Sequence, residues 1–239
     1  MKKSIVLAAL FALCVGSLAA SETTKTLELS AAGLKDLDIR AGAGSLKVVG
    51  REGLTSIEVK AEIVARHVRD EDMEEFLNDR VELVLEKRGD GAVLISRVRE
   101  RVRIFSFGDE AVINLTVSVP KSLAIAIDDG SGWIEVEDVA SLKIDDGSGS
   151  IRVDRVAGEV RIDDGSGGIE VNDVTGDVTV DDGSGEIIIR RIGGTVTIDD
   201  GSGSIDVEQV EKDVRLISTG SGEVNVSGVK GQVIRPNHR

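Results

Sequence analysis

The sequence predicts an all-β protein, a parallel β-solenoid built from two-strand coils of about 18 residues. The pentapeptide Asp-Asp-Gly-Ser-Gly occurs five times, at 128–132, 145–149, 163–167, 181–185 and 199–203, and successive copies lie 17, 18, 18 and 18 residues apart. A degenerate sixth copy spans 218–222, and a weaker echo spans 40–45. Repetition at a fixed short period indicates one supersecondary unit stacked on itself.

Apolar columns define the strands of this unit. After each Gly-Ser-Gly the second, fourth and seventh residues are aliphatic, as in Ile151, Val153 and Val156. This period of two predicts a strand with one buried face. A second aliphatic pair, such as Leu142 and Ile144, lies before each pentapeptide. Each unit therefore reads as strand, tight turn, strand and looser turn.

Two arrangements fit such a unit, an antiparallel meander and a parallel solenoid. Only the solenoid stacks each residue on its equivalent, about 4.8 Å away, and so explains why both turns recur by position. Outward-facing charges support the same register: one column reads Asp138, Arg155, Asp173, Arg191 and Gln209, and another reads Glu135, Arg152 and Glu170. Neighbouring coils then place opposite charges side by side, which favours the solenoid.

Four segments follow from these patterns. Residues 1–20 are expected to be a signal peptide, 21–120 an irregular β-rich part or cap, 121–234 the regular solenoid, and 235–239 a polar tail. Within the irregular part, Asp70 is expected to cap a short helix reaching about Asn78, with Met73, Phe76 and Leu77 on one face. Terminal units of a solenoid need such atypical covers.

The amino-terminal segment indicates export. Lys2 and Lys3 precede an apolar run from Ile5 to about Leu18, followed by small residues, which is typical of a secretory signal peptide. The alternative, a membrane anchor, needs about 20 apolar residues. We therefore expect a periplasmic or secreted protein with no integral membrane segment after cleavage. Loss of the two lysines changes the net charge from −14 to −16, which disfavours nucleic acid and favours cationic partners.

The paired aspartates form two ladders in the predicted solenoid. One interpretation is turn chemistry, in which the second aspartate accepts backbone N–H bonds from its own turn while the first faces water. The other is a calcium site between coils, since Ca²⁺ takes six to eight oxygen ligands. The candidate metal ligands are Asp128, Asp129, Asp145, Asp146, Asp163, Asp164, Asp181, Asp182, Asp199 and Asp200. The turn role is favoured, and no other cofactor is expected.

Two further features invite a binding role. Arg97, Arg99, Arg101 and Arg103 would project from one face of a strand, either paired with nearby acids or as a site for phosphate or anionic polysaccharide. Trp133 is the single tryptophan and follows the first full pentapeptide. We expect it to cover the junction between the irregular and regular parts, with stacking on a ligand as the alternative.

Catalysis has little support in the sequence, and no catalytic residue is predicted. His67 and His238 have no visible partners, and the single cysteine, Cys14, lies in the leader. Parallel β-helices do include polysaccharide-degrading enzymes, so an aspartate pair of that kind is an alternative. A catalytic pair is one special site, however, whereas these pairs recur five times.

Taken together, the leader, the β-rich start, the Val-Ser-Val-Pro segment ending at Pro120 and the Gly-Ser-Gly-centred repeats resemble the bacterial family called putative adhesin, a domain of unknown function. The resemblance covers roughly residues 25–230. It implies a parallel β-solenoid and supplies no catalytic residues. We therefore expect an exported, non-enzymatic scaffold that contacts an envelope or cell-surface component. The alternatives are a calcium-binding module and a polysaccharide-active enzyme.

Overall fold

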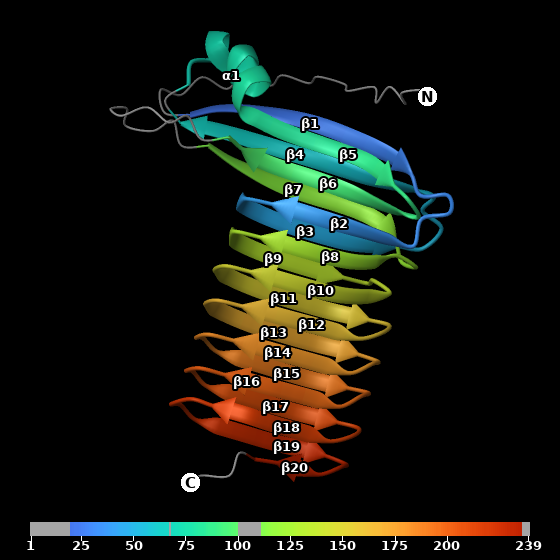
Figure 1. Ribbon diagram of the computed structural model, residues 1–239, viewed down its shortest axis with the longest axis vertical. Helices are drawn as coiled ribbons and strands as arrows, with labels where there is room; N and C mark the ends of the chain where they lie inside the picture. Colours follow the sequence, from blue (N-terminus) through green and yellow to red (C-terminus); the bar gives the residue numbers. More distant parts are fainter. Residues whose placement is uncertain (1–19, 67, 100–110, 236–239) are drawn as a thin grey trace.

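The structure, a computed structural model, describes residues 20–66, 68–99 and 111–235, and these form two facing sheets. In the regular part each coil gives one strand to either sheet. The first sheet receives β9 (Ser131–Glu137), β11 (Gly149–Val156), β13 (Gly167–Val174), β15 (Ile187–Ile192), β17 (Ile205–Val210) and β19 (Val224–Val229). The second receives β8 (Ala124–Asp129), β10 (Ser141–Asp146), β12 (Val160–Asp164), β14 (Val178–Asp182), β16 (Val196–Asp200), β18 (Val214–Thr219) and β20 (Val233–Ile234). These strands stack as a column (Figure 1).

Every pairing between neighbouring coils in this part is parallel and joins equivalent residues. Ile151 pairs with Ile134 on one side and Ile169 on the other, and Asp145 lies between Asp128 and Asp163. The aliphatic columns from both sheets are buried between them, with Val153, Val171 and Ile189 at 0% exposure. Because the core is filled by two rows of β-branched side chains, it is narrow, and the predicted parallel solenoid is confirmed.

The amino-terminal part contributes the remaining strands. They are β1 (Ala20–Ser30), β2 (Asp36–Ala41), β3 (Ala43–Arg51), β4 (Ser56–Arg66), β5 (Val81–Arg88), β6 (Gly91–Val98) and β7 (Ala111–Pro120). The first sheet has the order β1-β4-β7-β3-β9 and then the regular strands to β19, and the second has β5-β6-β2-β8 and then those to β20. Strands β1, β4 and β5 pair antiparallel with their neighbours, so the irregularity of this part is confined to the end of the stack.

The echo at 40–45 is a true coil. Strands β2 and β3 flank it and pair in parallel with β8 and β9, so that Gly44 lies beside Gly132. The chain then leaves the stack, builds β4 to β7 beyond this coil, and returns to continue with β8. The coil from 36 to 51 is therefore separated in sequence from the coil that stacks on it.

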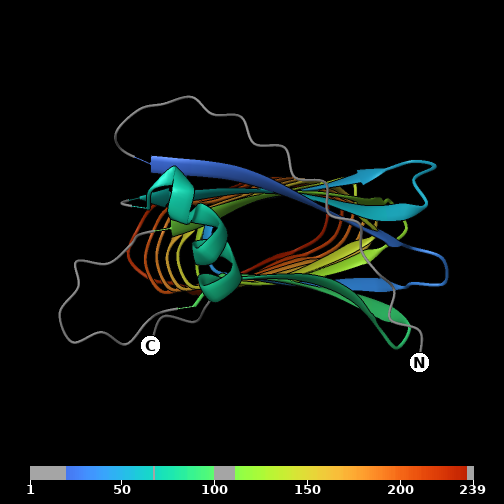
Figure 2. The ribbon, with the colours of Figure 1, turned by 90° about the horizontal axis from the view of Figure 1, so that it is seen from above.

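A short helical segment covers this end of the stack (Figure 2). A 3₁₀ turn spans Asp70–Asp72 and α1 spans Met73–Arg80, so that the helix ends two residues later than expected. Met73, Phe76 and Leu77 face the core, as predicted. The predicted capping role of Asp70 is wrong: α1 begins three residues later, and the Asp70 carboxylate instead accepts a 2.6 Å hydrogen bond from the Ser21 hydroxyl of β1.

Candidate functional site: the two aspartate columns

The strand before each Gly-Ser-Gly turn points its two aspartates in opposite directions, because successive strand residues alternate between faces. The first aspartate of each pair points outward. Asp128, Asp145, Asp163 and Asp181 are exposed and Asp199 is half-buried, and none of these five forms a hydrogen bond or ion pair with another described residue. We call this column of five carboxylates the acidic ridge. Its members repeat at the inter-coil spacing of about 4.8 Å.

The second aspartate of each pair points into the coil. These residues form the inner column: Asp129, Asp146, Asp164, Asp182 and Asp200, with 5, 3, 3, 2 and 0% exposure. In three of these residues Oδ1 accepts the backbone N–H of the serine two residues later, at 3.2 Å from Ser166 to Asp164 and at 3.1 Å from Ser184 to Asp182 and from Ser202 to Asp200. The Asx-turn role predicted for the second aspartate is confirmed for these three.

Each inner carboxylate keeps an unsatisfied oxygen. Oδ2 of all five residues, and also Oδ1 of Asp146, are buried without a hydrogen-bond partner. Burial raises the pKa of Asp129 to about 7, with the neighbouring Asp146 charge adding to the rise. Burial likewise raises the pKa of Asp164 and of Asp182 to about 6. In the folded protein Asp129, Asp164 and Asp182 therefore keep their protons to a higher pH than ordinary aspartates do.

Backbone hydrogen bonds stack the turns closely. The Gly165 N–H donates to the Asp146 carbonyl at 2.9 Å, and the Gly149 N–H donates to the Ser166 carbonyl at 2.9 Å. Gly167 has φ +147°, and a Cβ added there would overlap the Gly149 carbonyl oxygen. The second glycine of each repeat is thus required both by its backbone angle and by the close approach of the next coil.

The predicted calcium ligands do not gather around one point. Across the described ranges no three His, Cys, Asp or Glu side chains are grouped so that they could hold a metal ion. The two aspartates of a pair lie on opposite faces, so an ion between coils would draw carboxylates from one column only. Calcium stays an untested alternative for the inner column, where unpartnered oxygens exist.

The arginine segment is partly paired. Arg97 and Arg99 both contact Glu82 of β5, at 2.8 and 3.3 Å, and the hydrogen bond from Arg97 lowers the pKa of that carboxylate. Arg101 and Arg103 lie outside the described residues, as do His67, His238 and Cys14. The two arginines that are described therefore serve an ion-pair role.

Trp133 lies at the predicted junction, beside Ser45 of β3 and Ser150 of β11. Its side chain is 42% exposed, so it does not fill a core position there. Thr179 and Thr197 also stack on one another, on β14 and β16. No aromatic or threonine array extends from either feature within the described strands.

A left-handed corner on the opposite edge has no glycine signal in the sequence. Asp138, Arg155, Asp173, Arg191 and Gln209 have φ between 56° and 61°. Ion pairs predicted from the alternating charges join them: Arg155 to Asp138 at 3.1 Å and Arg191 to Asp173 at 2.6 Å. The left-handed conformation costs a residue other than glycine about 1–2 kcal/mol, and the ion pairs help to offset this cost.

Shallow hollows follow this corner. One, of about 590 Å³, is lined by Asp173, Arg191, Gln209 and Lys230 among others. Arg191 already pairs with Asp173, and Lys230 with Glu211 at 2.7 Å. Because these charges are satisfied within the chain, the acidic ridge is the stronger candidate for contact with a partner.

Comparison with known proteins assigns this architecture. The family model described as Toastrack DUF4097 matches residues 34–233. The chain belongs to the Toastrack DUF4097 family. Its resemblance to the putative-adhesin family is thereby confirmed, and the match includes the β2–β3 coil as well as the regular repeats. A search of curated proteins finds no match.

Solved structures resemble this chain at low sequence identity. A putative adhesin from Bacteroides fragilis is 14% identical, with 90% of this chain and 97% of that chain covered and a TM-score of 0.50. A putative lipid binding protein from Parabacteroides distasonis is 15% identical, with 90% and 95% covered and a TM-score of 0.45. A putative cell adhesion protein from Clostridium sporogenes is 16% identical, with 91% and 100% covered and a TM-score of 0.39.

Proposed function

We propose that this Toastrack protein is exported and acts, without catalysis, as a rigid interaction scaffold in the cell envelope, where the acidic ridge contacts a cationic envelope or cell-surface component. The observation that carries the proposal is the column of five outward carboxylates, which form no hydrogen bond or ion pair with another described residue. Equal spacing on a stack of hydrogen-bonded coils keeps these charges in a fixed line.

Electrostatics supports a cationic partner. Adjacent carboxylates about 4.8 Å apart repel by about 1 kcal/mol in water and by several times more near a protein surface. A bound polycation would relieve this repulsion, since one cationic group can lie between two carboxylates. Lys143 and Arg161 face the same side, two residues before Asp145 and Asp163, and neither forms an ion pair with the ridge among the described contacts.

Export and the absence of catalysis rest on further support. The amino-terminal segment has the character of a signal peptide. No helix in the described part of the chain is long and apolar enough to cross a membrane. The solved structure described as a putative adhesin from Bacteroides fragilis favours a binding role over an enzymatic one.

The test uses an oligolysine peptide as the probe and an oligoglutamate peptide as its negative counterpart. We expect the mature protein to bind oligolysine in a salt-dependent manner, measured by calorimetry, and to ignore oligoglutamate. Asparagine at all five ridge positions should abolish binding. Glutamine at Glu22, Glu28, Glu52, Glu74 and Glu75, five exposed acids outside the column, removes the same charge and should retain most of it. If both variants lost oligolysine binding equally, binding would depend on net charge and not on the ridge, which would contradict the proposal.

A further inference from the structure

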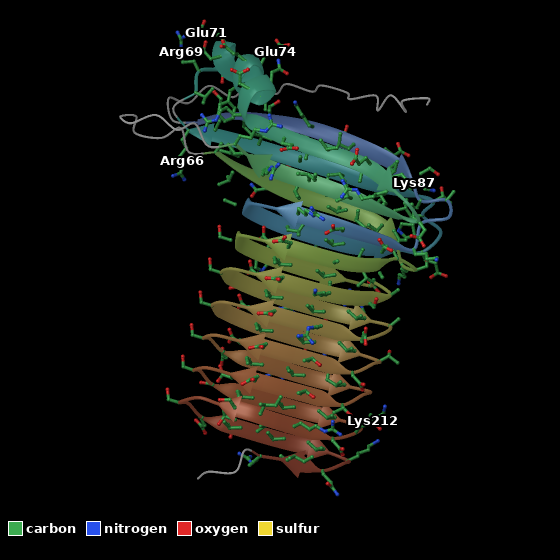
Figure 3. The ribbon with its side chains drawn as sticks, viewed as in Figure 1. Arg66, Arg69, Glu71, Glu74, Lys87 and Lys212 are labelled. Atoms are coloured by element: carbon green, nitrogen blue, oxygen red, sulfur yellow. The ribbon has the colours of Figure 1, made fainter. Side chains whose placement is uncertain are left out.

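The two ends of the solenoid are finished differently. At the amino-terminal end, antiparallel β1 and β5 are the outermost strands and α1 lies over them. Charged side chains surround this cover, including Arg69, Glu71 and Glu74 (Figure 3). At the other end the stack stops at β19 in the first sheet and β20 in the second. We call the surface formed by Val224–Val229 and Val233–Ile234 the open end.

Apolar side chains are uncovered at the open end. Val224, Val226 and Val229 are partly exposed, whereas their equivalents one coil earlier, Ile205, Val207 and Val210, are at most 1% exposed. Val233 and Ile234 are 42 and 44% exposed. The last members of the aliphatic core columns are therefore partly exposed to solvent on this surface.

Backbone groups there also have no hydrogen-bond partner among residues 20–66, 68–99 and 111–235. The Ile205 N–H donates to the Glu223 carbonyl at 2.9 Å, and peptide groups alternate in direction along a strand. Hence Val224 and Val226 point their own N–H and C=O groups away from β17, toward the free edge. The Val214 N–H donates to the Gln232 carbonyl in the same way, so Val233 directs its groups toward the free edge of β20.

The open end lacks the charges that usually keep sheet edges apart. The outward residues of β19 are Asn225 and Ser227, where the preceding coil carries Asp206 and Glu208. From Val224 to Ile234 the single charged residue is Lys230, which pairs with Glu211. At the capped end, the edge strand β1 carries Glu22, Lys25 and Glu28.

We propose that the open end binds a second copy of this chain, end to end, as a closed two-fold dimer. Consecutive strands of a coil run in opposite directions in the two sheets, so a copy rotated by half a turn about the strand direction presents β20 antiparallel to β19. The reverse pairing forms at the same time. Val233 of one copy then exchanges backbone hydrogen bonds with the Val224–Val226 stretch of the other, and the exposed valines continue one core.

Self-association suits this surface better than capture of an extended peptide. A single peptide would satisfy one of the two free edges, whereas a second copy satisfies both at once. The near-neutral rows place no like charges opposite each other. The two-fold contact uses the open end of both copies, and the described residues of the covered amino-terminal end present no matching surface, so the assembly closes at two copies and does not grow into a fibre.

The contact is small, so we expect a reversible dimer. A six-residue strand is about 20 Å long and the sheets lie about 10 Å apart, which gives an end surface well below the usual interface of about 800 Å² per partner. Sedimentation velocity of the mature chain should therefore show a monomer–dimer equilibrium between about 1 µM and 1 mM. Deuterium exchange at the Val224, Val226 and Val233 amides should slow as concentration rises.

The decisive variant is Val233→Lys, which places an inward charge on the edge of β20. Its matched control is Val112→Lys on β7, at a position of similar exposure, 37% against 42%, near the covered end. We expect Val233→Lys to stay monomeric at every concentration with an unchanged melting temperature, and Val112→Lys to dimerise like the parent. A parent that stays monomeric over the whole range, or a Val233→Lys dimer as stable as the parent's, would overturn the proposal.

Discussion

Asp164 and Asp182 occupy equivalent positions in neighbouring coils, paired in register between β12 and β14, and each is at least 97% buried. Each carboxylate gives one oxygen to the serine N–H of its own turn and leaves Oδ2 without a partner. Two ionised carboxylates in this arrangement would repel one another in a dry environment. A buried Oδ2 without a hydrogen-bond partner recurs in all five residues of the inner column, so protonation of the column affects every one of these coils.

Stability should fall as the pH rises from about 4 to about 7. Burial raises the pKa of Asp129 from 3.8 to about 7 and of Asp164 and Asp182 to about 6, so over this range the folded state binds more protons than the unfolded state. One pKa unit corresponds to about 1.4 kcal/mol, and about 1 kcal/mol shifts the melting temperature by about 2–4 °C. Melting should therefore occur several degrees higher at pH 5 than at pH 8.

Below about pH 4 the trend should reverse. The pKa of Asp138 is lowered by Arg155, and that of Asp173 by Arg191, so these groups contribute stability that is lost as the pH falls through their folded-state values. A melting curve recorded across the full range should have its maximum near pH 4. A maximum above pH 7 would show that ionisation of the inner column does not lower the stability of the folded state.

Replacement of an inner aspartate by asparagine should flatten this pH dependence. Asp164→Asn keeps the Oδ1 acceptor for the Ser166 N–H and removes the ionisation. The difference in melting temperature between pH 5 and pH 8 should shrink, measured by calorimetry. Asp163→Asn on the acidic ridge is the control, since that side chain is exposed, and it should leave the difference unchanged.

The turn glycines should tolerate no side chain. Gly167→Ala would force a methyl group against the Gly149 carbonyl oxygen, so we expect a loss of about 3 kcal/mol or failure to fold. At the adjacent Gly168 a Cβ would meet no atom within 4 Å, and Gly168→Ala should change stability by less than about 0.5 kcal/mol. Denaturant unfolding of the two variants measures the contrast, and similar losses would contradict the close-approach explanation.

Glycine should stabilise the left-handed corner where no ion pair holds it. Gln209 has φ 60°, and the equivalent position one coil later is Gly228 with φ 66°. Gln209→Gly relieves the backbone strain and should add about 0.5–1 kcal/mol, after allowance for the greater freedom of the unfolded chain. Arg191→Gly gains the same relief but loses the ion pair to Asp173, so it should bring no net gain.

Calcium should have little effect on folding. The described side chains form no cluster of three metal ligands, and the two aspartates of each pair lie on opposite faces of their strand. The melting temperature at neutral pH should be the same in millimolar calcium and in chelator. A rise of several degrees with calcium, absent with magnesium, would restore the calcium-binding alternative.

The regular coils could be predicted from the sequence because solenoid pairing repeats the sequence period. Ile151 stacks on Ile134 and Ile169, residues that occupy the same column of the repeat. The same reasoning predicted the Asx turns and the Arg155–Asp138 pair. The amino-terminal pairings could not be predicted, because antiparallel contacts such as Ala20 with Arg66 join residues with no common period.

Two local features also could not be predicted from the sequence. The left-handed corner carries Asp, Arg or Gln in the regular coils, so composition gave no sign of its positive φ. Asp70 had the residue type of a helix cap, but Ser21, 49 residues away, binds its carboxylate. The left-handed corner recurs whether or not an ion pair is present, as at Gln209, and the Ser21 contact joins distant segments, so short-range patterns contain neither feature.

The alternation of charge along the left-handed corner also restricts how the length of this protein can change. Loss of one 18-residue unit around Asp173 would leave the hydrophobic core and the turns in register but bring Arg155 beside Arg191. Loss of the two units that carry Arg155 and Asp173 would instead bring Asp138 beside Arg191, an attractive contact. Between Asp138 and Arg191, shortening should therefore proceed in pairs of coils, in increments of about 10 Å, because only an even number of coils keeps opposite charges in contact.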